Sequence, residues 1–248
     1  QYSAKALHIP AGKYKITAPL SIPKEYITIY GDGMWSTELN FGTTAGGGMT
    51  TATMTYLRPS FRDFGLRGDP GSGVGLDLGN ITGQVYLGEL HNVHIQSGGN
   101  AMFAPRFFSM AMINVAATSY SGHAFVVACG PGVSWNSCYA IQCGTGKAGY
   151  RLTGIINMIG CNGINTGDWW GIFGQDSAAS DGYQNDFPGL GTVYSDVNLV
   201  GCNIEEWASL STNGGGIMLH APWYDFKMMG GKIDRDALST GYKAIIQA

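Results

Sequence analysis

Short runs of alternating apolar and polar residues recur along the chain, and several of them share one pattern. In segment 196–206, the alternating run is followed by Gly201, Cys202 and Asn203. A segment with the same polarity at each position begins at Asp225, 29 residues later (225 − 196), and segment 155–162 matches the first eight positions. A repeat of about 20 to 50 residues indicates a solenoid, in which each unit buries its apolar face by stacking on the next.

A shorter form of the pattern consists of an aromatic residue or Leu, any residue, Asp or Asn, and an apolar-x-apolar run. It occurs at 61–66 and at 90–95. Asp63 and Asn92 are again 29 residues apart (92 − 63), and Asn92 and Asp196 are separated by 104 residues (196 − 92), which we interpret as four turns of 26. We therefore expect Asp63, Asn92, Asp196 and Asp225 to be equivalent positions, at which the side chain bonds to turn amides.

The length and spacing of the apolar runs decide between strands and helices. The runs are short and are bounded by Gly and Asn, whereas an amphipathic helix needs a longer segment with a period of 3.6. Stacked coils of short strands form parallel sheets, with neighbouring strands about 4.7 to 4.9 Å apart. The pattern predicts an all-β fold, a right-handed single-stranded parallel β-helix.

Composition agrees with one solenoid domain over residues 1–248. Glycine accounts for 39 of the 248 residues, as expected when each coil needs several tight turns with positive φ. Charged residues make up 12% and the net charge is −3, which argues against nucleic acid as a partner. No apolar run reaches transmembrane length, so we expect no membrane insertion. The five cysteines lack a paired zinc-binding spacing, so we expect them to be reduced and buried, with no metal and no cofactor.

The first 41 residues contain an ordered series of strands and turns. Strand 7–9 leads into the turn Pro10-Ala11-Gly12 and a second strand, and Ile22-Pro23, Gly31-Asp32-Gly33 and the strand at 37–41 follow. This order resembles the N-terminal coil of the pectate-lyase-like β-helix superfamily, in particular its phage tailspike and capsule-depolymerase branch. With the later repeats included, the resemblance extends over residues 4 to 234.

The resemblance implies a pectin-lyase-like β-helix that acts on a bacterial surface polysaccharide. It also implies a homotrimer of parallel solenoids and a location in the virion tail or outside the cell. In that family a short amphipathic helix precedes the Pro-Ala-Gly turn and caps the solenoid, whereas this chain has six residues before Leu7. We therefore expect the chain to be a piece of a longer protein.

One segment breaks the spacing of the repeats. From Ile155 to Asp196 is 41 residues (196 − 155), about 15 more than a period of 26, and the extra length falls within 165–194. Insertions in solenoids form loops on one face, often the binding face. The segment is rich in acidic and aromatic residues, and its adjacent Trp169 and Trp170 must either cover something or bind something.

Carboxylates are absent between Glu89 and Asp168, so an acid/base pair must come from the first third of the chain or from 168–236. Ile204 and Ile233 occupy the same inward position in the repeat, which points Glu205 and Asp234 outward on neighbouring turns, about 5 Å apart at the backbone. Like charges at that distance raise one pKa, which suits a general acid beside a nucleophile or base. The alternatives for either role are Glu206, Asp236, Asp168 and Asp176.

The same carboxylates have a structural alternative, in which they cap turn amides or pair with Lys232 or Arg235. Sugar rings present C–H faces that pack on aromatic side chains, so a glycan site needs aromatic residues in a polar groove. The residues that we expect to bind substrate are Trp169, Trp170, Trp207, Trp223, Tyr183 and Arg151. For the tryptophans, the alternative is loop packing or a subunit contact.

These features lead to three hypotheses for function. The first is a tailspike-type depolymerase that hydrolyses a glycosidic bond with Glu205 and Asp234 or a near neighbour. The second is a polysaccharide lyase that acts on a uronate by β-elimination, with Arg106, Lys147 and Arg151 as candidates to neutralise the acid sugar. The third is a non-catalytic glycan-binding or structural β-helix of a tail fibre.

Overall fold

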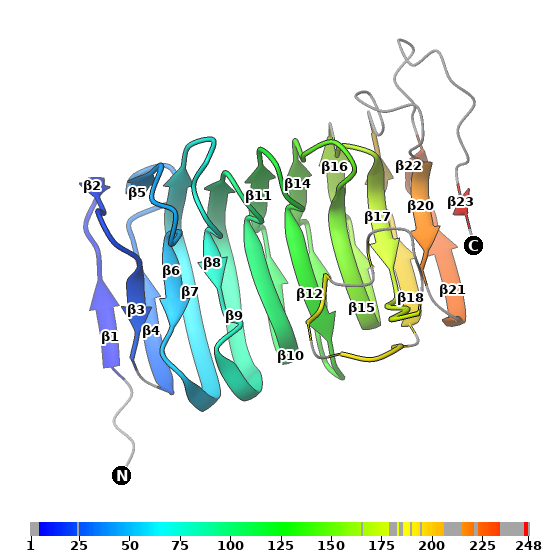
Figure 1. The fold of residues 1–248 in the computed structure, drawn as a ribbon, viewed down its shortest axis with the longest axis horizontal. Coiled ribbons are helices and arrows are strands. Elements are labelled where there is room, and N and C mark those ends of the chain that lie inside the picture. The colour runs from blue at the N-terminus through cyan, green and yellow to red at the C-terminus, as the bar shows by residue number, and fades with distance from the viewer. Residues whose placement is uncertain are drawn as a thin grey trace.

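The chain winds into a right-handed parallel β-helix of about eight turns, shown in Figure 1 with the stack of strands running along the long axis. A computed structural model describes residues 5–23, 25–164, 166–178, 183, 186–188, 190–193, 195–205, 215–220, 223–233 and 246–247. Within these residues there is no helix, and every pairing between named strands is parallel. The predicted fold class is therefore confirmed.

Three parallel sheets form the sides of the solenoid, and long strands bend from one sheet into the next. Sheet 1 contains β1 (Lys5–His8), β4 (Tyr26–Tyr30), β7 (Met54–Gly68), β9 (Ile81–Ser97), β10 (Met102–Ile113), β13 (Ser134–Asn136), β15 (Ala148–Ile159), β18 (Ser195–Val200) and β21 (Trp223–Met229).

Sheet 2 contains β2 (Gly12–Lys15), β5 (Thr37–Gly42), the ends of β7 and β9, β11 (Ala116–Ser119), β14 (Tyr139–Ile141), β16 (Asn162–Ile164), β19 (Asn203–Ile204) and β22 (Lys232–Ile233). Sheet 3 contains β3 (Leu20–Ile22), β6 (Met49–Thr51), β8 (Leu76–Asp77), the first parts of β10 and β15, β12 (Phe125–Cys129), β17 (Trp169–Phe173), β20 (Gly215–Leu219) and β23 (Ile246–Gln247).

The core is built from apolar side chains that stack in register from turn to turn. Alternate strand residues point to opposite faces, so each sheet contributes one inward row per coil. The inward row of sheet 1 is buried along most of its length and consists of Ile29, Phe61, Leu90, Met112, Trp135, Met158 and Leu199. This row gives each coil an apolar contact with the coil before it and the coil after it.

In the middle of the solenoid, large aromatic side chains in two sheets face small residues in the third. Phe125 and Tyr150 stack with ring centroids 5.3 Å apart, and Trp135 meets the Phe125 ring edge-on at 5.2 Å. Ala140 and Gly163 lie on neighbouring turns of sheet 2, where larger side chains would compete for the same space. Alternation of large and small residues fills the interior at native packing density.

The corner between sheets 1 and 2 repeats one backbone conformation through most of the molecule. Non-glycine residues with positive φ follow one another at Asp63 (60°), Asn92 (56°), Asn114 (50°) and Ser137 (51°). Asn92 Nδ2 donates to Asp63 Oδ1 over 2.7 Å, and Asn114 Nδ2 donates to Asn92 Oδ1 over 2.9 Å. Asn and Asp tolerate the left-handed region better than other non-glycine residues. Later coils continue the row with glycine, at positions 160, 201 and 230.

Part of the predicted register is confirmed and part is wrong. Asp196 pairs with Asp225, Ile155 pairs with Asp196, and Phe61 pairs with Leu90, as the repeat predicts. Asp196, however, begins a sheet 1 strand, whereas Asp63 and Asn92 turn the chain into sheet 2. Four turns after Asn92, the equivalent corner position is Gly201. The prediction chose Asp196 because the same apolar-x-apolar alternation follows Asn92 and Asp196, and this alternation does not distinguish one sheet from another.

All five cysteines are buried and none is in a disulfide, as expected. Cys161 and Cys202 lie at equivalent positions, since the residues that follow them, Asn162 and Asn203, are paired. Burial raises the pKa of the Cys129 and Cys143 thiols to about 12. The thiols are therefore protonated at neutral pH and fill space in the core.

The size matching between sheets predicts a specific effect of adding one methyl group. In Gly163→Ala the new Cβ would lie 2.5 Å from Cδ1 of Trp170. The fully buried indole would have to shift, and we expect the free energy of unfolding to fall by about 1–3 kcal/mol. Denaturant unfolding at equilibrium measures the change.

Gly191→Ala is the matched control, because no atom lies within 4 Å of a Cβ at that exposed position. A compatible Gly→Ala change is neutral or stabilises by up to about 1 kcal/mol. Equal stability of Gly163→Ala and the unmodified chain would contradict the proposed packing.

Candidate functional site

The insertion leaves the regular stack after Phe173. Within the predicted segment 165–194, β17 pairs with β15 on one side and β20 on the other, as in any other coil. Beyond it, Gln175 and Val193 form an antiparallel bridge, with N–H···O distances of 3.2 and 2.7 Å. This bridge closes the insertion into a loop that covers the outer surface of sheet 3, where Val126, Arg151 and Ile172 are fully buried.

Arg151 is the centre of the contacts that hold the insertion. Its Nε donates to Asp186 Oδ2 over 2.7 Å, Nη2 donates to Gln175 Oε1 over 2.6 Å, and Nη1 donates to the Gly174 carbonyl over 2.5 Å. The guanidinium also lies 4.9 Å from the ring centroid of Phe187. A buried charge is tolerated only when it is paired and hydrogen-bonded, and each of these partners lies in the insertion.

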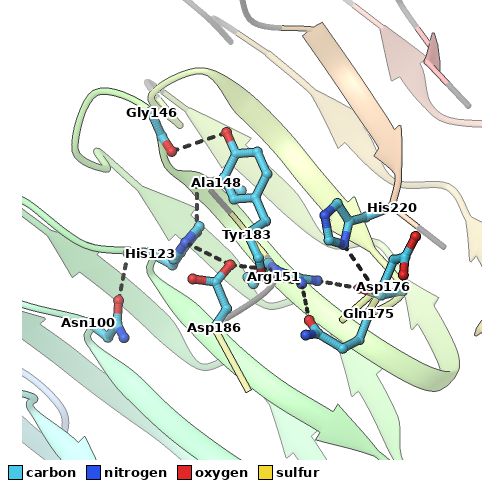
Figure 2. Close-up of polar contacts among 11 residues, drawn as sticks. Asn100, His123, Gly146, Ala148, Arg151, Gln175, Asp176, Tyr183, Asp186 and His220 are labelled. Carbon is cyan, nitrogen blue, oxygen red and sulfur yellow. Dashed lines mark hydrogen bonds and ion pairs between the residues drawn. The ribbon is translucent and has the colours of Figure 1, made fainter. Parts of the chain in front are cut away.

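His123 joins the same carboxylate from the preceding coil. Its Nδ1 accepts a hydrogen bond from the Ala148 N–H over 2.9 Å, and Nε2 lies 3.5 Å from Asp186 Oδ2 (Figure 2). Because Nδ1 is an acceptor, the neutral ring carries its proton on Nε2, which faces Asp186. Burial lowers the pKa of His123, and the charges of Lys147 and Arg151 act in the same direction.

The Asp186 carboxyl has a pKa below its usual value. Burial alone would raise it, but the nearby Nε2–H of His123 and the Arg151 guanidinium favour the ionised form more strongly. Asp186 is therefore a carboxylate shared by two side chains from different coils. We call the group of Arg151, His123, Asp186 and Gln175 the anchor cluster.

Two further predicted site residues lie at the edge of the anchor cluster. The Tyr183 hydroxyl donates to the Gly146 carbonyl over 3.2 Å, and Figure 2 shows its ring between His123 and His220. Asp168 Oδ1 accepts a hydrogen bond from the Gly146 N–H over 2.9 Å. Tyr183 is 9% exposed and Asp168 is 7% exposed, so both are largely covered.

The adjacent tryptophans have different environments. Trp170 belongs to the main core and contacts Tyr150 at 4.9 Å between ring centroids. Trp169 packs outside the coil with Ala148, Ile172 and Tyr183, beneath the insertion. Trp169 and Trp170 are 3% and 0% exposed, so in this structure both rings cover apolar surface.

Of the remaining predicted residues, the structure describes Glu205 and the backbone of Trp223. Glu205 directly follows β19, is half-buried, and donates its N–H to the Gly163 carbonyl over 3.1 Å. Ile204 and Ile233 pair as expected. Trp223 begins β21 opposite Ser195, and its side chain is outside the described part of the structure. Glu206, Trp207, Asp234 and Asp236 also lie outside the described residues.

Glu205 lies beside the outer face of sheet 2. One outward row runs in register through His94, Ala116, Tyr139, Asn162, Asn203 and Lys232. With one coil every 4.8 Å or so, the five steps of this row span about 24 Å. Glu205 is two residues beyond Asn203 and therefore points to the same side as the row. We call this surface the sheet 2 face.

Two grooves lie at the N-terminal end of the sheet 2 face. One, of about 440 Å³, is lined by Trp35, Tyr139, Asn92 and Asn114 among others, and the Trp35 residue is 71% exposed. The Trp35 indole leans on the His94 ring with 4.5 Å between centroids. A second groove, of about 770 Å³, is lined by both charged and aromatic residues, including Lys13, Tyr14, Lys15, Glu38, Arg67 and Asp69.

His94 is an uncharged hydrogen-bonding group at neutral pH. Burial lowers its pKa to about 4, and the nearby Arg67 charge acts in the same direction. Beside an exposed indole, a neutral imidazole and the corner residues Asn92 and Asn114 provide the combination of aromatic surface and polar groups that a sugar ring needs.

Trp35 and the other residues of these grooves were not selected from the sequence. Trp35 stands between Gly33 and Thr37 in an irregular segment, so no periodic pattern marks it. The sequence feature that could have identified Trp35 is a large aromatic residue in a Gly-rich turn, which in the structure is the corner that leads to sheet 2.

Neither a metal centre nor a membrane span is found in the described part of the chain. No group of three or more His, Cys, Asp and Glu side chains there could hold a metal ion. The described residues also include no helix of the length and apolarity required to cross a membrane.

The buried histidine predicts how the anchor cluster depends on pH. The unfolded chain binds a proton at His123 below about pH 6.5, whereas the folded chain, with its lowered pKa, does not. Stability is therefore complete above that pH and falls below it, by up to about 1.4 kcal/mol per pH unit for this group. His94 contributes in the same direction and over the same window, down to about pH 4.

A comparison with His123→Asn isolates the contribution of His123, because an Asn Oδ1 can accept the Ala148 N–H without titrating. The stability difference between the unmodified chain and the variant should shrink from pH 7 to pH 5. A difference that stays constant over this range would show that His123 is not a buried neutral ring.

Comparisons with known proteins agree with the fold. No family model and no curated protein matches the chain. Among solved structures, the chain resembles Geobacillus virus E2 ORF18, with 14% identity, a TM-score of 0.55, and 98% of this chain covered but 52% of that chain. The mannuronan C-5 epimerase AlgE4 A-module of Azotobacter vinelandii also matches, with 13% identity, a TM-score of 0.39, and coverage of 99% and 91%. The chain thus spans about half the length of the viral protein, and this likeness shows a shared fold.

Proposed function

We propose that the chain is the polysaccharide-binding and polysaccharide-cleaving β-helix of a phage tailspike-type protein, with the sheet 2 face as its glycan track. The observation that carries the proposal is the exposed Trp35 indole, which stands over a groove at one end of a 24 Å or so polar row. The likeness in fold to a viral protein supports a virion-associated role, and the expected partner is a bacterial surface polysaccharide.

The row along the sheet 2 face suits a chain-like ligand. Its members lie one to a coil, so a long polymer along the solenoid axis would meet one side chain of the row at each coil. His94, Tyr139, Asn162 and Asn203 offer neutral donors and acceptors, and Trp35 and Tyr139 offer ring faces. Such a surface binds through many modest contacts, which is how a polysaccharide is held in register.

For the chemistry we favour glycoside hydrolysis by Glu205 and Asp234. The pairing of Ile204 with Ile233 supports this choice, because the sequence repeat that predicts the carboxyl pair also predicts this pairing. Two carboxyl groups on neighbouring coils would fit a general acid beside a nucleophile or base. Glu206 and Asp168 remain the alternative acids, and Trp207 and Trp223 remain proposed sugar contacts near the same end.

Two alternatives keep their own support. A lyase would use Arg106 to neutralise a uronate, since Arg106 is exposed and none of the described residues that line its groove is a carboxylate. Arg151 is less suited to that role, because its donors already bond to the insertion. A non-catalytic glycan-binding β-helix would retain the sheet 2 face without the carboxyl pair. In each case a homotrimer is proposed as the assembly.

Removal of the Trp35 indole tests the glycan track. We expect Trp35→Ala to weaken binding of the target polysaccharide about 10-fold or more, because a stacked aromatic platform contributes roughly 1–2 kcal/mol. Binding is measured by titration calorimetry with purified capsule or O-antigen fragments. Tyr56→Ala removes another exposed aromatic ring, on a different side of the coil, and should leave affinity unchanged. Unchanged affinity in Trp35→Ala would place the glycan elsewhere.

Analysis of reaction products tests the chemistry. Mass spectrometry of oligosaccharides released from a panel of polysaccharides should give products one water heavier than the repeat unit. Glu205→Gln and Asp234→Asn should each slow release by about 100-fold or more if they act in proton transfer or nucleophilic attack, with Glu25→Gln as the control. Unsaturated products at the bare repeat mass would contradict hydrolysis and favour the lyase, and binding without release would favour the non-catalytic alternative.

A further inference from the structure

A separate groove lies where the insertion meets the corner between sheets 3 and 1. Its volume is about 490 Å³, within the range of small-molecule sites. It is lined on one side by Arg106 and Phe108, and on the other by Leu190 and Val193 of the insertion. Its residues belong to neither the sheet 2 face nor the carboxyl pair proposed above.

We infer that this groove binds an acidic sugar residue, with the carboxylate on Arg106 and the ring face on Phe108. Pockets for small ligands are mostly apolar and carry a few polar groups that set orientation. Here Pro105, Phe108, Leu190 and Val193 provide the apolar lining, and Gln84, Arg106 and Thr153 are the polar side chains.

Among the described residues that line the groove, Arg106 is the only charged one. Its guanidinium is exposed, and Nη1 donates to the Thr82 carbonyl, which fixes one end of the group. A guanidinium has five N–H donors, and a fork of two matches the geometry of a carboxylate. The groove therefore favours an anion of carboxylate shape over a neutral ligand of the same size.

Phe108 is positioned by a glycine beneath it. A Cβ at Gly130 would lie 2.0 Å from Phe108 Cδ1, so the ring rests directly on the backbone of the next coil. A ring supported in this way presents one face to the groove. The C–H face of a pyranose packs on such a surface, as does the ring of a uronate.

The opposite wall is held in place by the anchor cluster and by two local contacts. Val193 bonds through its backbone to Gln175, and Thr153 Oγ1 donates to the Val193 carbonyl over 3.5 Å. Gln175 in turn accepts from Arg151. A wall fixed before binding lowers the entropy cost of ordering the site.

Cys129 lines the floor of the groove, but burial raises the pKa of its thiol to about 12, so the thiolate is absent at neutral pH and Cys129 does not act as a nucleophile. We assign the groove a binding role. That the ligand is a sugar rests on the proposed function, whereas preference for an acid rests on Arg106.

Titration of two small glycosides into the full chain tests the inference. Methyl glucuronide and methyl glucoside differ in the carboxylate, and we expect the glucuronide to bind at least about 10-fold more tightly at low salt. Added salt should weaken the binding of the glucuronide but not that of the glucoside.

Variants of the groove test the two proposed contacts separately. Arg106→Gln should abolish the preference for the glucuronide, and Phe108→Ala should weaken the binding of both glycosides. Arg62→Gln removes a partly buried arginine at a different corner and serves as the charge-matched control.

Equal affinity for the two glycosides, or a preference that survives Arg106→Gln, would overturn the inference. If Phe108→Ala perturbs folding, Gly130→Ala provides a second test, because it displaces the ring and leaves Arg106 in place. Release of oligosaccharides without glucuronide binding would reject the groove and retain the proposed function. Glucuronide binding without any polysaccharide binding or cleavage would retain the groove as an acid-binding site and reject the proposed function.

Discussion

Each coil of this solenoid buries its inward side chains against the coils on either side. The inward side chains of each coil must therefore fill the space that the side chains of the neighbouring coils leave empty. This constraint explains why large rings in sheets 1 and 3 coincide with Ala140 and Gly163 in sheet 2. It also explains the repeated left-handed corner from Asp63 to Gly230, because a shift at one corner would misplace the inward rows of all later strands. Backbone pairing between coils then fixes the spacing of the side chains on the outer faces.

The insertion uses the same framework in a different way. A polar side chain on the outer surface of sheet 3 would normally be solvated, yet Arg151 is fully buried because residues 174–193 supply its partners. Loss of one partner would leave a buried charge unpaired, which costs far more than the pair contributes when intact. The anchor cluster thus converts a loop into a fixed wall, and the groove beside it keeps its shape without a ligand.

The sequence predicts the architecture better than it predicts the surface. Apolar-x-apolar runs that end at a glycine turn align 155, 196 and 225, because burial imposes the alternation directly. The alternation is the same in every sheet, which is why Asp63 and Asp196 looked equivalent. Arg151 and Asp186 are 35 residues apart, and their pairing depends on a loop path that no local pattern encodes. The adjacent Trp169 and Trp170 separate into two clusters because neighbouring residues of strand β17 point to opposite faces of the sheet. Trp35 lies in a turn without periodicity.

The central claim is that a polysaccharide lies along the sheet 2 face, and a crystal structure of the chain with a bound fragment of its polysaccharide tests it most directly. The account predicts sugar rings against Trp35, near His94 and Tyr139, with the chain of sugars running parallel to the solenoid axis toward Glu205. A fragment bound on the outer surface of sheet 1, or one that runs perpendicular to the solenoid axis without touching Trp35, would contradict it.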